Sequence, residues 1–242
     1  MARWRPETYV VFSIELRRFV RDWPSFFVIS LIPAATFFML RLVTNAPPEV
    51  ETRLLAGAMV FSVGMQSINT TGQIMVSERF EGQMKLFRTS PVSQGSYVVG
   101  VTIFSTVIAA LKAVVLLGIV AAAGVDFHLS PLLVPLVIMS GFALPGFAVL
   151  IATYVRTAQA GNMLVQMIGI AVVFISPVFY PIERLPEVLQ WLASLSPFTH
   201  AGQAFLEVLE GGLSILVPVV ILLAFMVVTN ALGIYKMRWR EP

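Results

Sequence analysis

Six stretches of this chain are apolar over about the length that a helix needs to cross a lipid bilayer. A helix of about 20 apolar residues covers roughly 30 Å of hydrocarbon. The stretches are Ser25–Val43, Leu54–Val76, Tyr97–Gly124, Leu132–Val155, Gly161–Tyr180 and Leu213–Tyr235. The sequence therefore predicts an all-α integral membrane protein with six transmembrane helices, forming a single transmembrane domain over residues 1–242.

Composition supports lipid as the solvent of this chain. Only 12% of its 242 residues are charged, whereas soluble domains carry about 25%. Cysteine is absent and the two histidines, His128 and His200, lie far apart in sequence, so neither thiolates nor clustered imidazoles are available for a metal site. The net charge is only +3 without one basic patch, so no nucleic-acid partner is expected.

The distribution of arginine and lysine predicts which loops face the cytoplasm, because cytoplasmic loops are enriched in these residues. With both termini inside, twelve basic residues lie inside and two, Arg53 and Arg184, lie outside. Arg41 and Lys112 fall within spans. We therefore expect a multi-pass protein of the cell membrane with cytoplasmic N- and C-termini.

An amphipathic helix is predicted before the first span, over Glu7 to Trp23. Aromatic and aliphatic residues recur at helical spacing, and the opposite face is charged. The apolar stripe is Tyr9, Phe12, Leu16, Phe19 and Trp23, and the polar face carries Glu15, Arg18 and Asp22. Such a helix can lie in the inner membrane interface. The alternative is a basic flank that only orients the protein, which does not explain the aromatic stripe.

The loop after the second span contains a short helix candidate. Phe80, Met84 and Phe87 form an apolar stripe at helical spacing among charges of alternating sign, and Pro91 ends the segment. A cytoplasmic helix of this kind is suited to contact a partner. A solvated loop lying against lipid headgroups is an equally good interpretation of the periodicity.

The region between the fifth and sixth spans, Ser176 to Gly212, is too apolar for a free loop. A stripe over Leu185–Leu195 and a second segment over Ala201–Leu209 predict two helices too short to span, separated at Pro197. We expect an outer re-entrant helical hairpin, which is tolerated where protein buries the backbone or the backbone lines a cavity. A lone histidine such as His200 is more often an interfacial hydrogen-bonding residue than a titrating one.

Several polar residues fall inside the predicted spans. Lys112 is near the middle of the third, where it could face a translocation cavity and attract an anionic group, or snorkel or bond to a neighbouring helix. Amides recur at helical steps on the second and fifth spans, either lining a pathway or joining helices. The possible pathway residues are Gln66, Asn69, Gln73, Lys112, Asn162 and Gln166.

Two segments resemble the type-2 ABC export permease family. Glu78-Arg79-Phe80-Glu81-Gly82 followed by Leu86, Thr89, Pro91 and Ser93 is similar to the family's E-R-E-x-G…L…[TS]-P-x-S pattern, with Phe80 where an acidic residue is common. The outer hairpin is similar to the second hallmark through Pro177, Tyr180, Pro181, Leu185, Pro186, Trp191, Pro197 and His200. The resemblance implies that a coupling helix docks on an ATPase through Glu78, Arg79, Phe80, Glu81, Gly82, Leu86, Phe87, Thr89 and Pro91.

The resemblance also implies an assembly of two permeases, identical or paralogous, with two separate ATP-binding subunits. The chain lacks the G-x-x-x-x-G-K-[ST] phosphate-binding loop, so ATP and Mg would be bound by the partner and this chain would be a transport subunit and not an enzyme. The expected cargo is a hydrophobic or amphiphilic compound. Alternatives are an ion-coupled secondary transporter, which normally has acidic residues within spans, and a polytopic membrane enzyme.

Overall fold

The computed structural model describes residues 4–83, 90 and 92–236, and only the backbone at 4–6, 172–175 and 236. Every regular element in these residues is a helix, which confirms the all-helical prediction. The elements are α1 Trp4–Arg21, α2 Trp23–Thr44, α3 Pro48–Val60, the π-helix η1 Phe61–Met65, α4 Gln66–Phe80, α6 Gln94–Ala122, α7 Leu133–Ala143, α8 Pro145–Tyr154, α9 Ala158–Ile175, the 3-10 helix η2 Ile182–Arg184, α10 Glu187–Ser194, α11 Pro197–Leu209 and α12 Leu216–Lys236.

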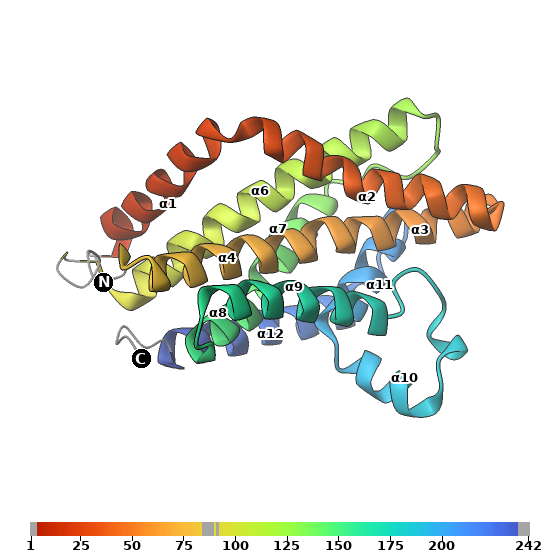
Figure 1. The fold of residues 1–242 in the computed structure, drawn as a ribbon. Coiled ribbons are helices and arrows are strands. Elements are labelled where there is room, and N and C mark those ends of the chain that lie inside the picture. The colour runs from red at the N-terminus through yellow and green to blue at the C-terminus, as the bar shows by residue number, and fades with distance from the viewer. Residues whose placement is uncertain (1–3, 84–89, 91, 237–242) are drawn as a thin grey trace.

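The helices form an elongated bundle whose chain reversals gather at its two ends (Figure 1). The start of α1, the end of α4, the α8–α9 junction and the end of α12 lie at one end. The α2–α3 turn, the α6–α7 loop and α10 lie at the other. The chain therefore starts and finishes its path through the bundle on the same side.

Four helical segments of the described residues are long and apolar enough to cross a membrane: Trp23–Thr44, Gln94–Ala122, Leu133–Tyr154 and Leu216–Tyr235. The other two predicted spans are also helical. Leu54–Val76 is divided among α3, η1 and α4, and Gly161–Tyr180 begins within α9, which ends at Ile175. A count of six spans stays a prediction.

The turn between α2 and α3 has the residues that such a reversal needs. Asn45 ends α2 in the left-handed conformation, with φ 48°, and asparagine tolerates this region better than most residues. Pro48 then occupies the first turn of α3, where its missing N–H costs no helical bond. Arg41 Nε donates to Glu51 Oε1 at 2.7 Å across the turn, so this predicted intramembrane arginine is paired.

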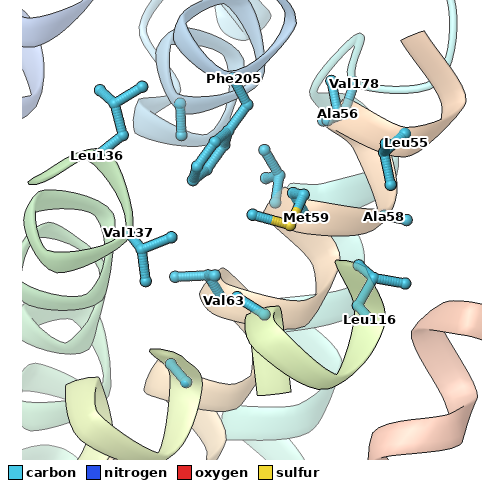
Figure 2. Close-up of a cluster of buried hydrophobic side chains, with 14 of the residues drawn as sticks. Leu55, Ala56, Ala58, Met59, Val63, Leu116, Leu136, Val137, Val178 and Phe205 are labelled. Atoms are coloured by element: carbon cyan, nitrogen blue, oxygen red, sulfur yellow. The ribbon is translucent and has the colours of Figure 1, made fainter. Parts of the chain in front are cut away.

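The main core lies where α3, η1, α6, α7 and α11 meet (Figure 2). Met59 and Val63 of the second predicted span share this cluster with Phe205 of α11 and Leu116 of α6. Small residues bring these helices close together: a Cβ built on Gly64 would lie 2.4 Å from the Phe198 ring. Such close approach at small residues is typical of helix packing in membranes.

The predicted amphipathic helix is present as α1, and it packs along α6. Val11 is buried against Gly100, and the Phe12 and Phe19 rings lie edge-on to Phe104 at 6.3 and 6.2 Å. The predicted polar face differs at one position: Glu15 is buried, at 4% exposure, because it lies against the end of α4, where Arg18 of α1 pairs with both Glu15 and Glu78.

The predicted outer hairpin consists of α10 and α11. α11 is buried between α3, α7 and α12, whereas α10 projects from the bundle (Figure 1). α11 starts at Pro197, four residues before the predicted Ala201, because Ser196 caps it by accepting a bond from the Phe198 N–H and proline fits the first turn. The re-entrant depth of the hairpin stays a prediction.

Candidate functional site

The second predicted span changes its helical geometry just before Gln66, its first amide residue. The π-helix η1 ends at Met65, and Gln66 starts α4. Short π-segments inside α-helices are frequent at functional sites, because the extra residue shifts the side chains that follow. From Gln66 onward, Asn69, Thr70 and Gln73 recur at three- and four-residue steps on one face of α4.

This face of α4 lines a pocket of about 450 Å³ that is bounded by α1, α2, α4 and α6. The polar wall includes four residues of α4 and Lys112 of α6. The apolar wall consists of Phe19, Phe26, Ile29, Ile74, Phe104 and Ile108. The structure thus brings four of the predicted pathway residues, Gln66, Asn69, Gln73 and Lys112, to one cavity.

Lys112 is the buried charged residue that α6 contributes to this wall, at 5% exposure. Its Nζ donates to Gln66 Oε1, and the amide of Gln66 donates in turn to Thr70 Oγ1. The Nζ also lies 5.9 Å from the centre of the Phe26 ring. The sequence left open whether Lys112 faces a cavity or bonds to a neighbouring helix, and in the structure it does both.

The two pathway residues on α9 lie elsewhere. Neither Asn162 nor Gln166 lines the pocket. Gln166 is exposed on the outer face of α9, and Asn162 Oδ1 is buried without a partner among the described residues. Any pathway that includes them therefore requires surfaces other than this pocket.

A charged cluster joins the end of α4 to α1 and α6, next to the pocket. Arg18 Nη1 lies 2.7 Å from both Glu15 Oε1 and Glu78 Oε1. The Tyr97 hydroxyl donates to Glu78 Oε2 at 2.5 Å. Burial raises the pKa of Glu15 to about 7, the charge of Glu78 raises it further, and Arg18 opposes both.

The sequence indicated Glu78 but not its partners. Glu78 is only 2% exposed, so its side chain is committed to contacts within this chain. Arg18 and Glu78 are 60 residues apart, and Tyr97 lies in an apolar stretch. No local pattern links them. The available signal was Tyr97 itself, at the start of an apolar predicted span. A tyrosine buried there usually has a hydrogen-bond partner for its hydroxyl.

Arg79 binds the end of another helix. Its Nη1 donates to the carbonyl oxygens of Ala152, Thr153 and Val155 at 2.5, 2.9 and 3.2 Å. These carbonyls lie at and just beyond the end of α8, where backbone acceptors lack helical partners and a cation is favourable. Arg79 thus fixes α4 to α8.

The remaining predicted coupling residues differ in exposure. Phe80 is half-buried with Arg79 5.2 Å above its ring, whereas Glu81 is exposed. Gly82 has φ 77°, a left-handed conformation that favours glycine and directs the chain away from α4. Four predicted coupling residues lie outside the described residues: Leu86, Phe87, Thr89 and Pro91.

The predicted hairpin residues occupy two environments. Pro197 is buried with α11, and Pro177, Tyr180, Pro181, Leu185 and His200 are half-buried. Trp191, 77% exposed, and Pro186 lie on the outer surface. His200 Nε2 lies 2.9 Å from the Ser194 carbonyl oxygen and so joins α11 to the end of α10. This is the hydrogen-bonding role that the sequence favoured for it.

Comparisons with known proteins match the sequence of this chain over most of its length. The profile of the family described as "ABC-2 type transporter" matches residues 6–209, from α1 through α11. A protein of Bacillus subtilis (strain 168) named "Putative transport permease YvfS" is 30% identical over 241 residues, covering 94% of this chain and 95% of that protein.

Proposed function

The chain belongs to the ABC-2 type transporter family, and from this premise we propose that it is the transmembrane permease subunit of an ATP-binding-cassette exporter. It would move a hydrophobic or amphiphilic compound (a drug, a lipid or a lipid-linked glycan) out of the cytoplasm. A separate subunit would bind ATP and Mg and hydrolyse the ATP. The family match over residues 6–209, which includes α1, the pocket and the hairpin, carries the proposal.

The proposed arrangement has six spans and cytoplasmic termini, with two permease copies or paralogues in one complex. The gathering of the start of α1, the end of α4 and the end of α12 at one end of the bundle supports it (Figure 1). Six crossings, an even number, would place the N- and C-termini on the same side of the membrane. The positively charged loops of the sequence then assign this end to the cytoplasm.

The contacts at the end of α4 support a coupling role for the segment that follows. Glu78 fixes this end to α1 and α6 through Arg18 and Tyr97, and Arg79 fixes it to α8. Glu81 is exposed immediately beyond these anchors. Movement of an ATPase bound at Glu81 would therefore move three neighbouring helices together with α4, and this is how hydrolysis could open the permease.

The alternative is an ion-coupled transporter, and the two buried acids, Glu15 and Glu78, are the residues to consider for it. A proton relay needs ionisable groups along the membrane interior. Both acids instead lie at one end of the bundle and share Arg18. This placement favours a structural ion-pair cluster over a relay, so we retain the exporter.

Co-purification with the ATP-binding subunit tests the proposal. Glu81→Arg reverses an exposed charge and breaks no hydrogen bond to α1, α6 or α8, so the permease should still insert. Loss of an interface anchor costs more than about 1 kcal/mol, which weakens binding about fivefold or more. We expect less retained ATPase and slower transport per ATP hydrolysed.

Glu187→Arg is the matched control, because Glu187 is an exposed acid at the opposite end of the bundle. It should retain the ATPase. Phe80→Ala is a weaker test, since Phe80 also packs within this chain. If Glu81→Arg and Glu187→Arg both keep the full complex and full transport, the coupling role of this segment is wrong.

A further inference from the structure

The pocket between α1, α2, α4 and α6 contains a positive charge, that of Lys112, which no carboxylate of the described residues pairs with. An ammonium group has three N–H donors, and the bond from Lys112 to Gln66 uses one. No ion pair of the described residues includes Lys112. A charge buried in this way is costly unless an opposite charge accompanies it.

The other charged residues of the pocket, Glu15, Arg18 and Asp22, lie on or next to α1, and two of the three are acids. Arg18 is shared between two carboxylates, those of Glu15 and Glu78. Asp22 accepts a hydrogen bond from Ser25 Oγ at 2.7 Å, and this neutral donor leaves the negative charge of Asp22 in place. The end of the pocket near α1 is therefore unattractive to an anion, whereas the end at Lys112 attracts one.

The amide side chains near Lys112 can donate further hydrogen bonds to an anionic group bound there. Asn69 and Gln73 line the pocket on successive turns of α4, and no hydrogen bond of the described residues engages the Gln73 amide. Gln66 to Gln73 covers about 10 Å of helix. The polar wall is thus long enough for a head group larger than a single ion.

The opposite wall is apolar and reaches the surface of the bundle. Phe26 and Ile108 line the cavity, and Ile29 of α2 lines it while being 48% exposed. α2 packs on α3 and α6 but covers little of α4, so the cavity lies beside the gap between α2 and α4. An acyl chain leaving the pocket there would remain in contact with apolar side chains and lipid.

We propose that this pocket binds the anionic head of an amphiphile, a phosphate or carboxylate, with Lys112 as its counterion and the tail directed between α2 and α4. The identification of this amphiphile with the exported compound rests on the function proposed above. Binding itself requires only this chain. Failure of one proposal is therefore distinguishable from failure of the other.

Three matched probes test the proposal on the purified permease in detergent, by isothermal titration calorimetry. Dihexanoyl phosphatidic acid carries both head and tails, dihexanoylglycerol lacks the phosphate, and glycerol 3-phosphate lacks the tails. We expect phosphatidic acid to bind about tenfold more tightly than either of the others, because a charge-assisted contact and apolar burial both contribute.

Two substitutions assign that preference to Lys112. Lys112→Met keeps the length of the side chain and removes the charge, so it should reduce phosphatidic acid binding to the level of dihexanoylglycerol. Gln66→Glu keeps Lys112 but supplies an internal counterion, so it should weaken binding of the anion similarly. Arg156→Met, which removes an exposed arginine outside the pocket, should leave binding unchanged.

Three results would overturn the proposal. Equal affinity for phosphatidic acid and dihexanoylglycerol would show that the charge is not recognised. Equal affinity for glycerol 3-phosphate would show that the pocket takes a free anion and not an amphiphile. Full phosphatidic acid binding by folded Lys112→Met and Gln66→Glu proteins would place the site elsewhere. None of these results depends on coupling to the ATPase.

Discussion

Arg18 holds two buried carboxylates together, and this arrangement makes Glu15 sensitive to pH. The pKa of Glu15 is raised from 4.5 to about 7, first by burial, then by the charge of Glu78, against the opposing charge of Arg18. A carboxyl with a raised folded-state pKa favours the protonated native state. Stability from Glu15 is therefore greatest below pH 4.5 and falls as pH rises toward and through about 7.

Glu15→Gln should remove that pH dependence. Glutamine can still accept a bond from Arg18, but it carries no charge to bury. We expect the parent Tm in detergent to fall between about pH 5 and pH 8, and the Glu15→Gln Tm to change less over this range. Glu187→Gln, at an exposed acid, is the control. An unchanged Tm slope in Glu15→Gln would show that another group dominates.

The burial of Glu15 shows where sequence patterns fail at this scale. Helical periodicity assigned it to the polar face of α1, and Arg18 and Asp22 on that face are exposed. Whether a charge on such a face meets water or a partner depends on which helix packs beside it. Here Glu78 and Tyr97 arrive from helices that are distant in sequence. Gln66 is a similar case. Its helical spacing predicted that it could line a pathway, but its bond to Lys112 depends on how α6 packs beside α4.

At the scale of helices, Arg79 connects two elements that are not adjacent in sequence. Its three carbonyl contacts supply donors to the end of α8, whose last backbone oxygens have no helical partners. Arg79 was predicted as an ATPase contact because it lies in the family motif. Its bonds to the end of α8 show that it also fixes α4 to α8, and its contact with an ATPase stays a prediction.

Arg79→Met should therefore destabilise the permease. Buried acceptors that lose a charged donor cost about 1–3 kcal/mol, which corresponds to a Tm lower by several degrees for a chain of this size. Arg156→Met is the matched control, since this exposed arginine immediately follows Val155. A normal Tm for Arg79→Met, combined with loss of the ATPase, would instead assign Arg79 to the interface.

The helices themselves were largely predictable, because lipid requires long apolar stretches and proline and glycine interrupt them. The interruptions of helical geometry within the predicted spans were less predictable from the sequence. The fourth predicted span divides at Leu144 into α7 and α8, with Pro145 starting the second helix. The π-helix before Gln66 has no comparable signal, since its residues Phe61–Met65 would also suit an α-helix. Within it, Gly64 packs closely against Phe198, a contact between segments that are distant in sequence.

For the whole molecule, the two ends of the bundle have different chemical character. One end carries the Glu15–Arg18–Glu78 cluster and the Arg79 contacts, and the other carries the Arg41–Glu51 pair and the exposed Trp191. Exposed tryptophan is typical of a membrane interface. The bundle is thus polarised along its length. The assignment of the first end to the cytoplasm rests on arginine and lysine counts.

Cysteine labelling tests that assignment directly, because the chain contains no cysteine and needs no prior substitution. Glu49 lies in the first turn of α3 and Asp126 in the α6–α7 loop, and both elements lie at the end of the bundle opposite the end of α4, which Gln83 follows. We expect Glu49→Cys and Asp126→Cys to react with a membrane-impermeant maleimide in intact cells. Gln83→Cys and a cysteine tag after Pro242 should react only after the membrane is opened. Labelling of Gln83→Cys from outside would invert the topology, and it would place the segment proposed to bind the ATPase on the side where no ATP is available.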